Sequence, residues 1–177
     1  MRLDAKIVWG AIIAAVLAHV AFVYAVPRVL MGVAIERLGA GGVNRWTVAD
    51  RVTPVSRSIV RPAPDFAYSA CAYDLADGPV VIQAAPWESY WSLSLYAANS
   101  DNYFVIDDRE ARFGAEIRLV RKGRPHPEGA AMVVESPSRR GIALIRRLAP
   151  NASEYARATL TARADVCASA AQSRPAE

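Results

Sequence analysis

A stretch of twenty residues near the amino terminus limits what this chain can fold into. Residues 7–26 read IVWGAIIAAVLAHVAFVYAV and carry no formal charge. As a helix rising 1.5 Å per residue, this stretch is roughly 30 Å long, which matches the hydrocarbon layer of a membrane. Trp9 and Tyr24 stand near its two ends, where aromatic rings favour the membrane interface. The sequence therefore predicts a transmembrane helix over residues 7–28.

A cleaved signal peptide is the competing interpretation of the same stretch. Val23 and Ala25 offer small residues to a peptidase just before Pro27. However, the apolar stretch is longer than the roughly 7–15 residues of a usual signal-peptide core, and a proline directly after the candidate bond argues against cleavage there. We therefore expect the helix to stay attached as an anchor.

The charges flanking the helix do not fix its orientation. Arg2 and Lys6 precede it, whereas Arg28, Arg37 and Arg45 follow it, so the positive-inside rule gives no clear preference. An amino-terminal anchor followed by two cysteines favours a globular domain outside the cytoplasm, which in a bacterium is the periplasm. The expected divisions are a cytoplasmic amino terminus at 1–6, the transmembrane helix at 7–28, a juxtamembrane helix and glycine linker at 29–44, a β-rich domain with a carboxyl-terminal helix at 45–172, and a tail at 173–177.

The net charge of +4 does not call for a nucleic-acid partner. The basic residues are mostly arginines scattered between acids rather than gathered in one run, as on an ordinary mixed-charge surface. A modest positive charge also suits a surface near anionic lipid. The expected partner is membrane lipid, contacted through the amino-terminal helix, and no nucleic acid.

Two cysteines, Cys71 and Cys167, lie in the second part of the chain and form no CxxC pair. In an oxidising compartment they could form one disulfide, and closing so long a loop stabilises a fold by about 4 kcal/mol in the chain-entropy model. Free cysteines are also common as small core residues. The sequence leaves both states open.

The remainder of the chain is typical of an all-β domain. Short β-favouring runs alternate with turn signals such as Asp77-Gly78-Pro79 and Lys122-Gly123, at the spacing of a β-sandwich or barrel. We expect a mainly β fold with strands at 56–61, 66–74, 79–84, 90–97, 103–106, 116–122, 131–135 and 141–148.

The clearest expected strand is 90–97, which reads YWSLSLYA. Alternation places Trp91, Leu93 and Leu95 on one face, which we expect to be core. Tyr90, Ser92, Ser94 and Tyr96 share the other face, which is either solvent-exposed surface or the floor of an aromatic, polar groove.

A helix is expected to close the domain. Asn151 can cap its amino terminus and Glu154 can reach back to complete a capping box. The helix should run to about Ala170, which puts Cys167 on its last turns.

No catalytic signature is present in the domain. His126, the one histidine outside the apolar stretch, lies between two prolines, and no GxSxG, HExxH or phosphate-loop motif occurs. We expect neither a metal nor a cofactor. Acidic residues are frequent enough to supply a paired acid and base of the kind found in glycosidases, namely Asp65, Asp74, Glu88, Asp101, Asp107 and Asp108.

Four motifs resemble those of the bacterial DUF1254 family, a family of proteins of unknown function. They are RPAPDFAYS at 61–69, DL at 74–75, GPV at 78–80 and YWSL at 90–93. The resemblance spans about 41–167 and implies a membrane-associated envelope protein, often found beside a DUF1214-type protein, which is therefore a candidate partner. It implies no established reaction. Residues of these motifs and the following turn form a candidate ligand site, comprising Asp65, Tyr68, Asp74, Tyr90, Trp91, Tyr96, Asn99 and Asn102.

Two functional hypotheses follow. The leading one is a non-enzymatic envelope module that binds a partner protein or a small sugar-like ligand through its aromatic polar face. The alternative is an envelope hydrolase that uses paired carboxylates. An enzyme of that kind needs two acids about 5–10 Å apart in a concave cleft, whereas a binding module needs a flat or grooved patch rich in Tyr and Trp.

Overall fold

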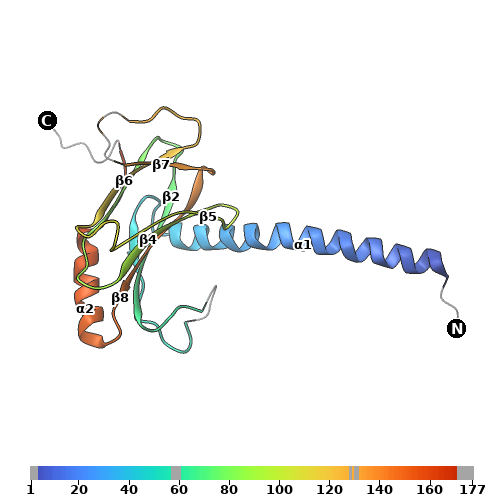
Figure 1. Ribbon diagram of the computed structural model, residues 1–177, viewed down its shortest axis with the longest axis horizontal. Coiled ribbons are helices and arrows are strands. Elements are labelled where there is room, and N and C mark those ends of the chain that lie inside the picture. Colours follow the sequence, from blue (N-terminus) through green and yellow to red (C-terminus); the bar gives the residue numbers. More distant parts are fainter. Residues whose placement is uncertain (1–3, 57–60, 128, 130–131, 171–177) are drawn as a thin grey trace.

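A long helix projects from a small β-sandwich in the computed structural model, which describes residues 4–56, 61–127, 129 and 132–170 (Figure 1). The helix, α1, spans Ala5–Gly39 and begins where the Asp4 side chain accepts a hydrogen bond from the Lys6 amide. It is long and apolar enough to cross a membrane, which a signal sequence also would be. Pro27 lies inside α1 without ending it, and residues 29–39 continue the same helix.

The described residues form two facing sheets. The first sheet has the order β1-β2-β8-β4-β5, with β1 Trp46–Val48, β2 Phe66–Asp74, β8 Arg140–Leu148, β4 Trp91–Ala97 and β5 Asn102–Asp107, all antiparallel. The second sheet has the order β7-β6-β3-β9, with β7 Val133–Ser136, β6 Ala115–Arg121, β3 Val80–Ala84 and β9 Val166–Ser169. The expected fold class is confirmed: a mainly β sandwich with a carboxyl-terminal helix and a preceding apolar helix.

The core lies between the two sheets. Alternating residues of β4 and β6 supply much of it, and Leu93, Leu95, Ile117 and Leu119 are fully buried. A disulfide joins Cys71 of β2 to Cys167 of β9 and so links the first sheet to the second.

The carboxyl-terminal half of α1 packs on the outer face of the first sheet. Ala34 and Ile35 are buried there against Ala72 and Ile142. Closer to the amino terminus, the Ser100 hydroxyl donates a hydrogen bond of 2.8 Å to the carbonyl oxygen of Pro27. The helix therefore joins the domain through side-chain packing as well as through the chain that follows it.

The carboxyl-terminal helix is shorter than expected. The Asn151 cap is confirmed, because its side-chain oxygen accepts a hydrogen bond of 2.9 Å from the Glu154 amide and starts α2, Ala152–Thr161. The prediction that this helix extends to about Ala170 was wrong. One turn of 3₁₀ helix, Ala162–Ala164, follows α2, and Asp165 then turns the chain into β9. The carboxylate of Asp165 is held by Arg147 and the Ala85 amide, so the chain pairs with β3 instead of continuing as a helix.

Some expected elements differ from the structure at the edges of the sheets. The three-residue strand β1 and the strand β9 were not predicted. Of the strand expected at 56–61, residues 57–60 lie outside the described residues, and Ser56 and Arg61 are not in strands. The start of the strand expected at 131–135 and the tail at 173–177 also fall outside them.

Candidate functional site

The structure brings two of the expected ligand residues together. Tyr68 of β2 and Tyr90, just before β4, both lie next to Phe66 on the outer face of the first sheet. The Phe66 ring stands edge-on to Tyr90 at 5.9 Å and tilted to Tyr68 at 6.3 Å. The Arg146 guanidinium lies 6.0 Å from the centre of the Phe66 ring. We call Phe66, Tyr68, Tyr90 and Arg146 the aromatic face.

The strand register explains this grouping. Tyr68 of β2 and Ser92 of β4 are both paired with Arg146 of the central strand β8, so the three side chains point to the same side of the sheet. The Ser92 hydroxyl oxygen accepts hydrogen bonds of 3.3 and 3.2 Å from Arg146. The Tyr68 hydroxyl oxygen accepts one of 3.0 Å from the Ala63 amide. These bonds fix the positions of the arginine and of the tyrosine ring.

The aromatic face shares its sheet face with α1. The helix covers the far end of β2 and β8, at Ala72 and Ile142, whereas Tyr90 at the near end is 38% exposed. The outer face of the first sheet is thus divided between the aromatic face and α1, whose carboxyl-terminal end meets the sandwich in Figure 1.

Trp91 does not belong to this site. As the alternation of the strand predicts, it points inward with Leu93 and Leu95 and is fully buried. Its selection as a ligand residue is therefore corrected: a surface ligand cannot reach an indole inside the core.

Three other expected ligand residues, Tyr96, Asn99 and Asn102, lie apart from the aromatic face. Tyr96 follows Tyr90 by six positions along β4, a distance of roughly 20 Å in a strand. The Asn99 side chain donates to the Asp101 carboxylate in the β4–β5 turn, and Asn102 follows that turn in an exposed position.

Of the two expected aspartates, Asp74 has charged side-chain partners, whereas Asp65 is bonded through its backbone. The Asp74 carboxylate lies 3.4 Å from both Arg139 and Arg140. The backbone carbonyl of Asp65 accepts a hydrogen bond of 2.7 Å from the Ala149 amide, while the residue itself is exposed. Among the described residues, no three histidine, cysteine or acidic side chains are grouped to hold a metal ion.

One cleft brings together two of the acids considered for catalysis. Glu88 and Asp108 line a hollow of about 530 Å³ with Arg112 and Phe113. Asp108 has one buried carboxylate oxygen without a hydrogen-bond partner in the described part of the chain. The Glu88 side chain is 83% exposed and pairs with Arg157 at 3.2 Å, so it keeps its hydration, whereas a general acid is usually desolvated.

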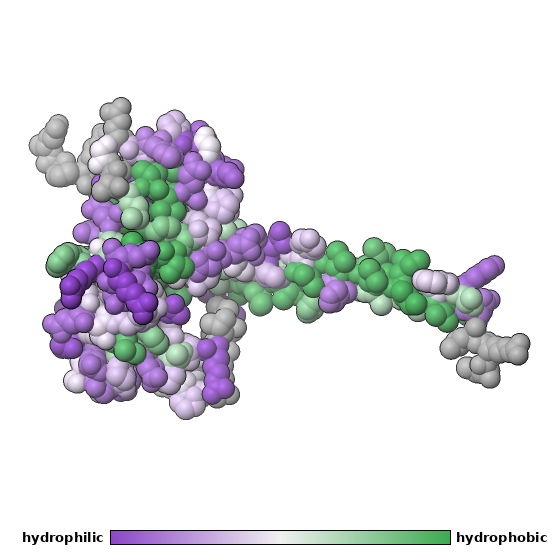
Figure 2. Space-filling model, in the orientation of Figure 1, coloured by the Kyte–Doolittle hydropathy of each residue, from purple (hydrophilic) through white to green (hydrophobic). Residues whose placement is uncertain are grey.

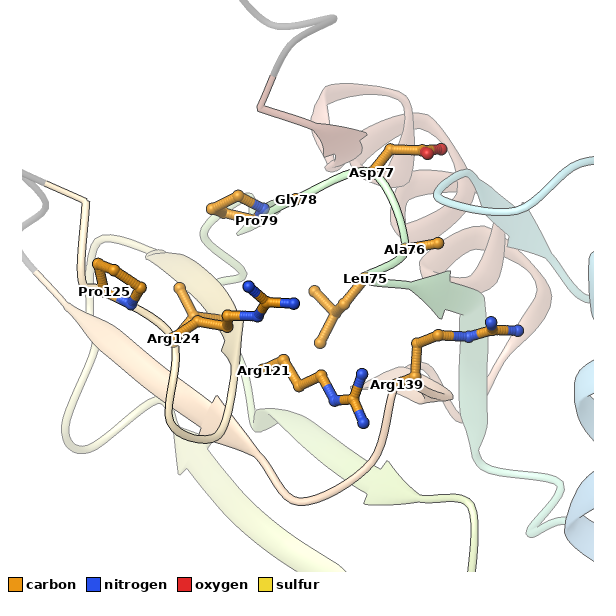
Figure 3. A pocket seen from close by; sticks show the side chains of 10 residues that line it. Leu75, Ala76, Asp77, Gly78, Pro79, Arg121, Arg124, Pro125 and Arg139 are labelled. Atoms are coloured by element: carbon orange, nitrogen blue, oxygen red, sulfur yellow. The ribbon is translucent and has the colours of Figure 1, made fainter.

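A second cleft, which the sequence did not reveal, lies at another end of the sandwich. It has a volume of about 580 Å³ and is lined by the β2–β3 loop, the end of β6 and the β7–β8 turn. Arg121, Arg124 and Arg139 border it (Figure 3). We call it the arginine cleft. Its arginines are spread over the sequence, and only the fold places them side by side.

Comparisons with known proteins identify the family and the fold of the domain. The model of the DUF1254 family, proteins of unknown function, matches residues 43–167. The VPA0106 protein from Vibrio parahaemolyticus is similar with a TM-score of 0.63 and 13% identity, over 82% of this chain and 36% of that one. An uncharacterised protein from Burkholderia cenocepacia is similar with a TM-score of 0.47 and 18% identity, over 64% of this chain and 33% of that one.

This chain therefore spans about a third of the length of the solved structures it matches. The likeness to the Vibrio protein shows the fold alone. A search of curated proteins gives no match.

Proposed function

The chain belongs to the DUF1254 family of proteins of unknown function, and we propose that it is a non-enzymatic binding module of the cell envelope, held at a membrane by α1. The domain lies on the outer side of that membrane, which in a bacterium is the periplasm. The aromatic face is its ligand-binding surface.

The observation that carries the proposal is the exposure of the apolar part of α1. Trp9, Leu17 and Phe22 are 65–66% exposed, and Figure 2 shows a mainly apolar surface along the outer part of the helix, bounded by hydrophilic residues at both ends. Water contact over so large an apolar surface costs free energy in proportion to its area. A lipid bilayer removes that cost, so membrane lipid is the proposed partner of α1.

The end of the apolar surface has the features of a membrane interface. Arg28 donates a hydrogen bond of 2.7 Å to the Tyr24 carbonyl oxygen, and its guanidinium lies 5.7 Å from the Tyr24 ring centre. An arginine and a tyrosine at this position suit the level of the lipid head groups. The β4–β5 turn is bonded to Pro27, just beyond, so the domain sits close to the membrane surface.

The disulfide supports a location of the domain outside the cytoplasm. Stable disulfides form in oxidising compartments such as the periplasm and are rare in the cytoplasm. The bond between Cys71 and Cys167 connects the two sheets, which makes it part of the fold. Fusing a reporter that is active only in the periplasm to the carboxyl terminus should give signal. A cytoplasm-only reporter that is active at the same position would overturn the orientation.

The aromatic face suits a sugar-like ligand. Two tyrosines and a phenylalanine offer apolar ring surface, while the Arg146 guanidinium and the hydroxyl of the exposed Tyr90 offer polar groups beside it. Rings flanked by a few polar groups are typical of small-ligand sites. The proposed partner protein of the module is a DUF1214-type envelope protein, as the family resemblance implies.

The aromatic face is tested by binding of envelope oligosaccharides to the full chain in detergent. Phe66→Ala/Tyr90→Ala should weaken binding by about tenfold or more, because each aromatic contact contributes about 0.5–1.5 kcal/mol beyond its buried area. Val105→Ala is the control, since Val105 is 50% exposed and outside both the aromatic face and the cleft of Glu88 and Asp108. Equal loss in the control, or no loss in the double variant, would remove the aromatic face from the proposal.

A hydrolase with paired carboxylates is the second candidate, and the unpartnered buried oxygen of Asp108 in one cleft with Glu88 is the observation that favours it. This hypothesis predicts that the purified chain hydrolyses an envelope glycan. Asp108→Asn should abolish the hydrolysis while leaving the fold intact. Activity unchanged in that variant would exclude this pair.

A further inference from the structure

The arginine cleft has the chemistry of a second ligand site, independent of the aromatic face. We infer that it binds the phosphate group of a small phosphorylated molecule. The inference rests on where the backbone places the arginines, on their missing acidic partners, and on the shape of the cleft.

Backbone hydrogen bonds bring the arginines together. Arg121 ends β6, and the Arg124 amide donates a bond of 3.0 Å back to its carbonyl oxygen. Gly123 makes that tight turn possible with a φ of +79°, a value that glycine adopts at little cost. On the opposite wall, the Leu75 amide donates a bond of 3.0 Å to the carbonyl oxygen of Arg139, which fixes the β7–β8 turn beside the β2–β3 loop.

Of the three arginines that border the cleft, only Arg139 has an acidic partner among the described residues. Among the described residues, neither Arg121 nor Arg124 has a carboxylate within ion-pair distance. Figure 3 shows the Arg124 guanidinium directed toward Leu75 and the Arg121 guanidinium extending past Leu75 toward Arg139, while the Asp77 carboxylate points away. Arg139 is paired with Asp74, which Arg140 also contacts. Arg121 and Arg124 are exposed, so water screens their mutual repulsion, but an anion in the hollow that both border is attracted by both guanidinium groups at once.

The geometry of the groups favours phosphate. A guanidinium presents paired N–H donors that match two oxygens of a phosphate, and such charged hydrogen bonds are about twice as strong as neutral ones. The floor of the cleft is apolar, with Leu75, Pro79 and Val120. A volume of about 580 Å³ also leaves room beside the phosphate for a compact organic group. The ligand class is therefore a phosphate monoester of a compact organic group.

A phosphate monoester in solution and a lipid head group share this chemistry, and the position of the cleft favours the former. Arg140, next to Arg139, lies against Gly39 at the end of α1. Gly39 is eleven residues beyond Arg28, which is roughly 17 Å of helix. If α1 spans the membrane to Arg28, head groups lie well below the cleft. This choice of source rests on the proposed anchor, but phosphate binding itself does not.

The test is calorimetric titration of the full chain in detergent with glycerol 3-phosphate, with glycerol as the uncharged comparison. The wild-type chain should bind the phosphate ester and not glycerol. Arg121→Gln/Arg124→Gln should weaken the Kd by at least about 30-fold, because two charged hydrogen-bonding groups are lost. Arg45→Gln/Arg109→Gln removes the same charge from exposed positions outside the cleft and should change the Kd less than about threefold.

A second variant tests whether any loss of binding reflects the charge of the cleft and not a change in the fold. Ala76→Glu places a carboxylate at an exposed position on the rim of the cleft and should also abolish binding, with the thermal unfolding transition unchanged. The inference is overturned if the wild-type chain does not bind glycerol 3-phosphate, or if the double arginine variant binds it as tightly as wild type.

Vesicles distinguish the two sources of phosphate. The full chain is reconstituted in phosphatidylcholine with or without phosphatidylglycerol, and glycerol 3-phosphate is titrated in both. Equal affinity supports a ligand from solution. Weaker affinity in the presence of phosphatidylglycerol, absent in the double arginine variant, would show that a head group occupies the cleft and would overturn the choice of source.

Discussion

The hydroxyl of Ser100 donates a hydrogen bond of 2.8 Å to the carbonyl oxygen of Pro27, and so joins the β4–β5 turn to the middle of α1. A second contact lies further along the helix, where Ile35 packs on Ile142 of β8. Together the two contacts make the last third of α1 a part of the domain's own packing. The glycines after Gly39 therefore do not serve as a flexible tether between an anchor and an independent domain.

Truncating Ile35 should destabilise the domain. Ile35 is 4% exposed and packs against Ala72 and Ile142, so Ile35→Ala leaves a cavity and should lower the free energy of unfolding by about 2–4 kcal/mol. Denaturant unfolding of the full chain in detergent, followed by tryptophan fluorescence, measures this. Glu36→Ala, on the exposed side of the same turn, is the control and should change stability little. Equal stability of both variants would show that α1 does not support the fold.

The disulfide should contribute strongly to stability. Cys71 and Cys167 are 96 positions apart, and a loop of that size corresponds to about 4–5 kcal/mol in the chain-entropy model. Cys71→Ser/Cys167→Ser should lose most of this free energy, and added reductant should destabilise the wild-type chain but not the variant. If reductant leaves wild-type unfolding unchanged, the disulfide is not formed in the native protein.

The coupling between Arg147 and Asp165, which form a buried ion pair, can be measured by a double-mutant cycle. The two side chains are at most 2% exposed, and their shortest contact is 2.6 Å. Asp165→Ala should cost about 3–5 kcal/mol, because it leaves a guanidinium buried without its counter-ion. Arg147→Met in the same chain should recover part of the loss. Additive effects of the two substitutions on unfolding would mean that the pair is not coupled.

The hydroxyls of Tyr73 and Tyr103 should make the stability of the domain fall at alkaline pH. Burial raises the pKa of Tyr73, although hydrogen bonds with Ser136 and Tyr103 oppose this. Burial and the neighbouring Tyr73 raise the pKa of Tyr103. The folded chain therefore holds these protons to higher pH than the unfolded chain does. The contribution is complete below about pH 10 and falls as the pH rises further, by up to about 1.4 kcal/mol per pH unit for each group.

Unfolding measured between about pH 8 and about pH 11 tests this sign. Tyr73→Phe/Tyr103→Phe should lower stability at neutral pH, because their hydroxyls bond to each other and to Ser136. The double variant should also show a smaller decrease in the free energy of unfolding as the pH rises through the alkaline range. A double variant with the same alkaline slope as wild type would show that other groups cause it.

Local patterns were sufficient to predict most of the fold. Alternation along β4 placed Trp91, Leu93 and Leu95 in the core, where all three are fully buried. The Asn151 cap marked the start of α2. The end of that helix was not predictable in the same way, because Asp165 is held by Arg147, a residue of a distant strand. The strand β1 was too short to show a pattern of its own.

The candidate sites were harder to predict than the fold. Tyr68 and Tyr90 carry strand and motif signals, but their grouping with Phe66 and Arg146 follows from register across three strands. The arginine cleft gave no sequence signal, because Arg121 and Arg139 are eighteen positions apart. They meet only where the β7–β8 turn folds back beside the end of β6.

Membrane attachment through an uncleaved α1 is the central claim, and alkaline carbonate extraction of native membranes, with mass spectrometry of the intact chain, tests it most directly. The full-length chain should remain in the membrane pellet, and its mass should include residues 1–26. Recovery of the protein in the soluble fraction, or a mature chain that begins at Pro27 or beyond, would contradict it.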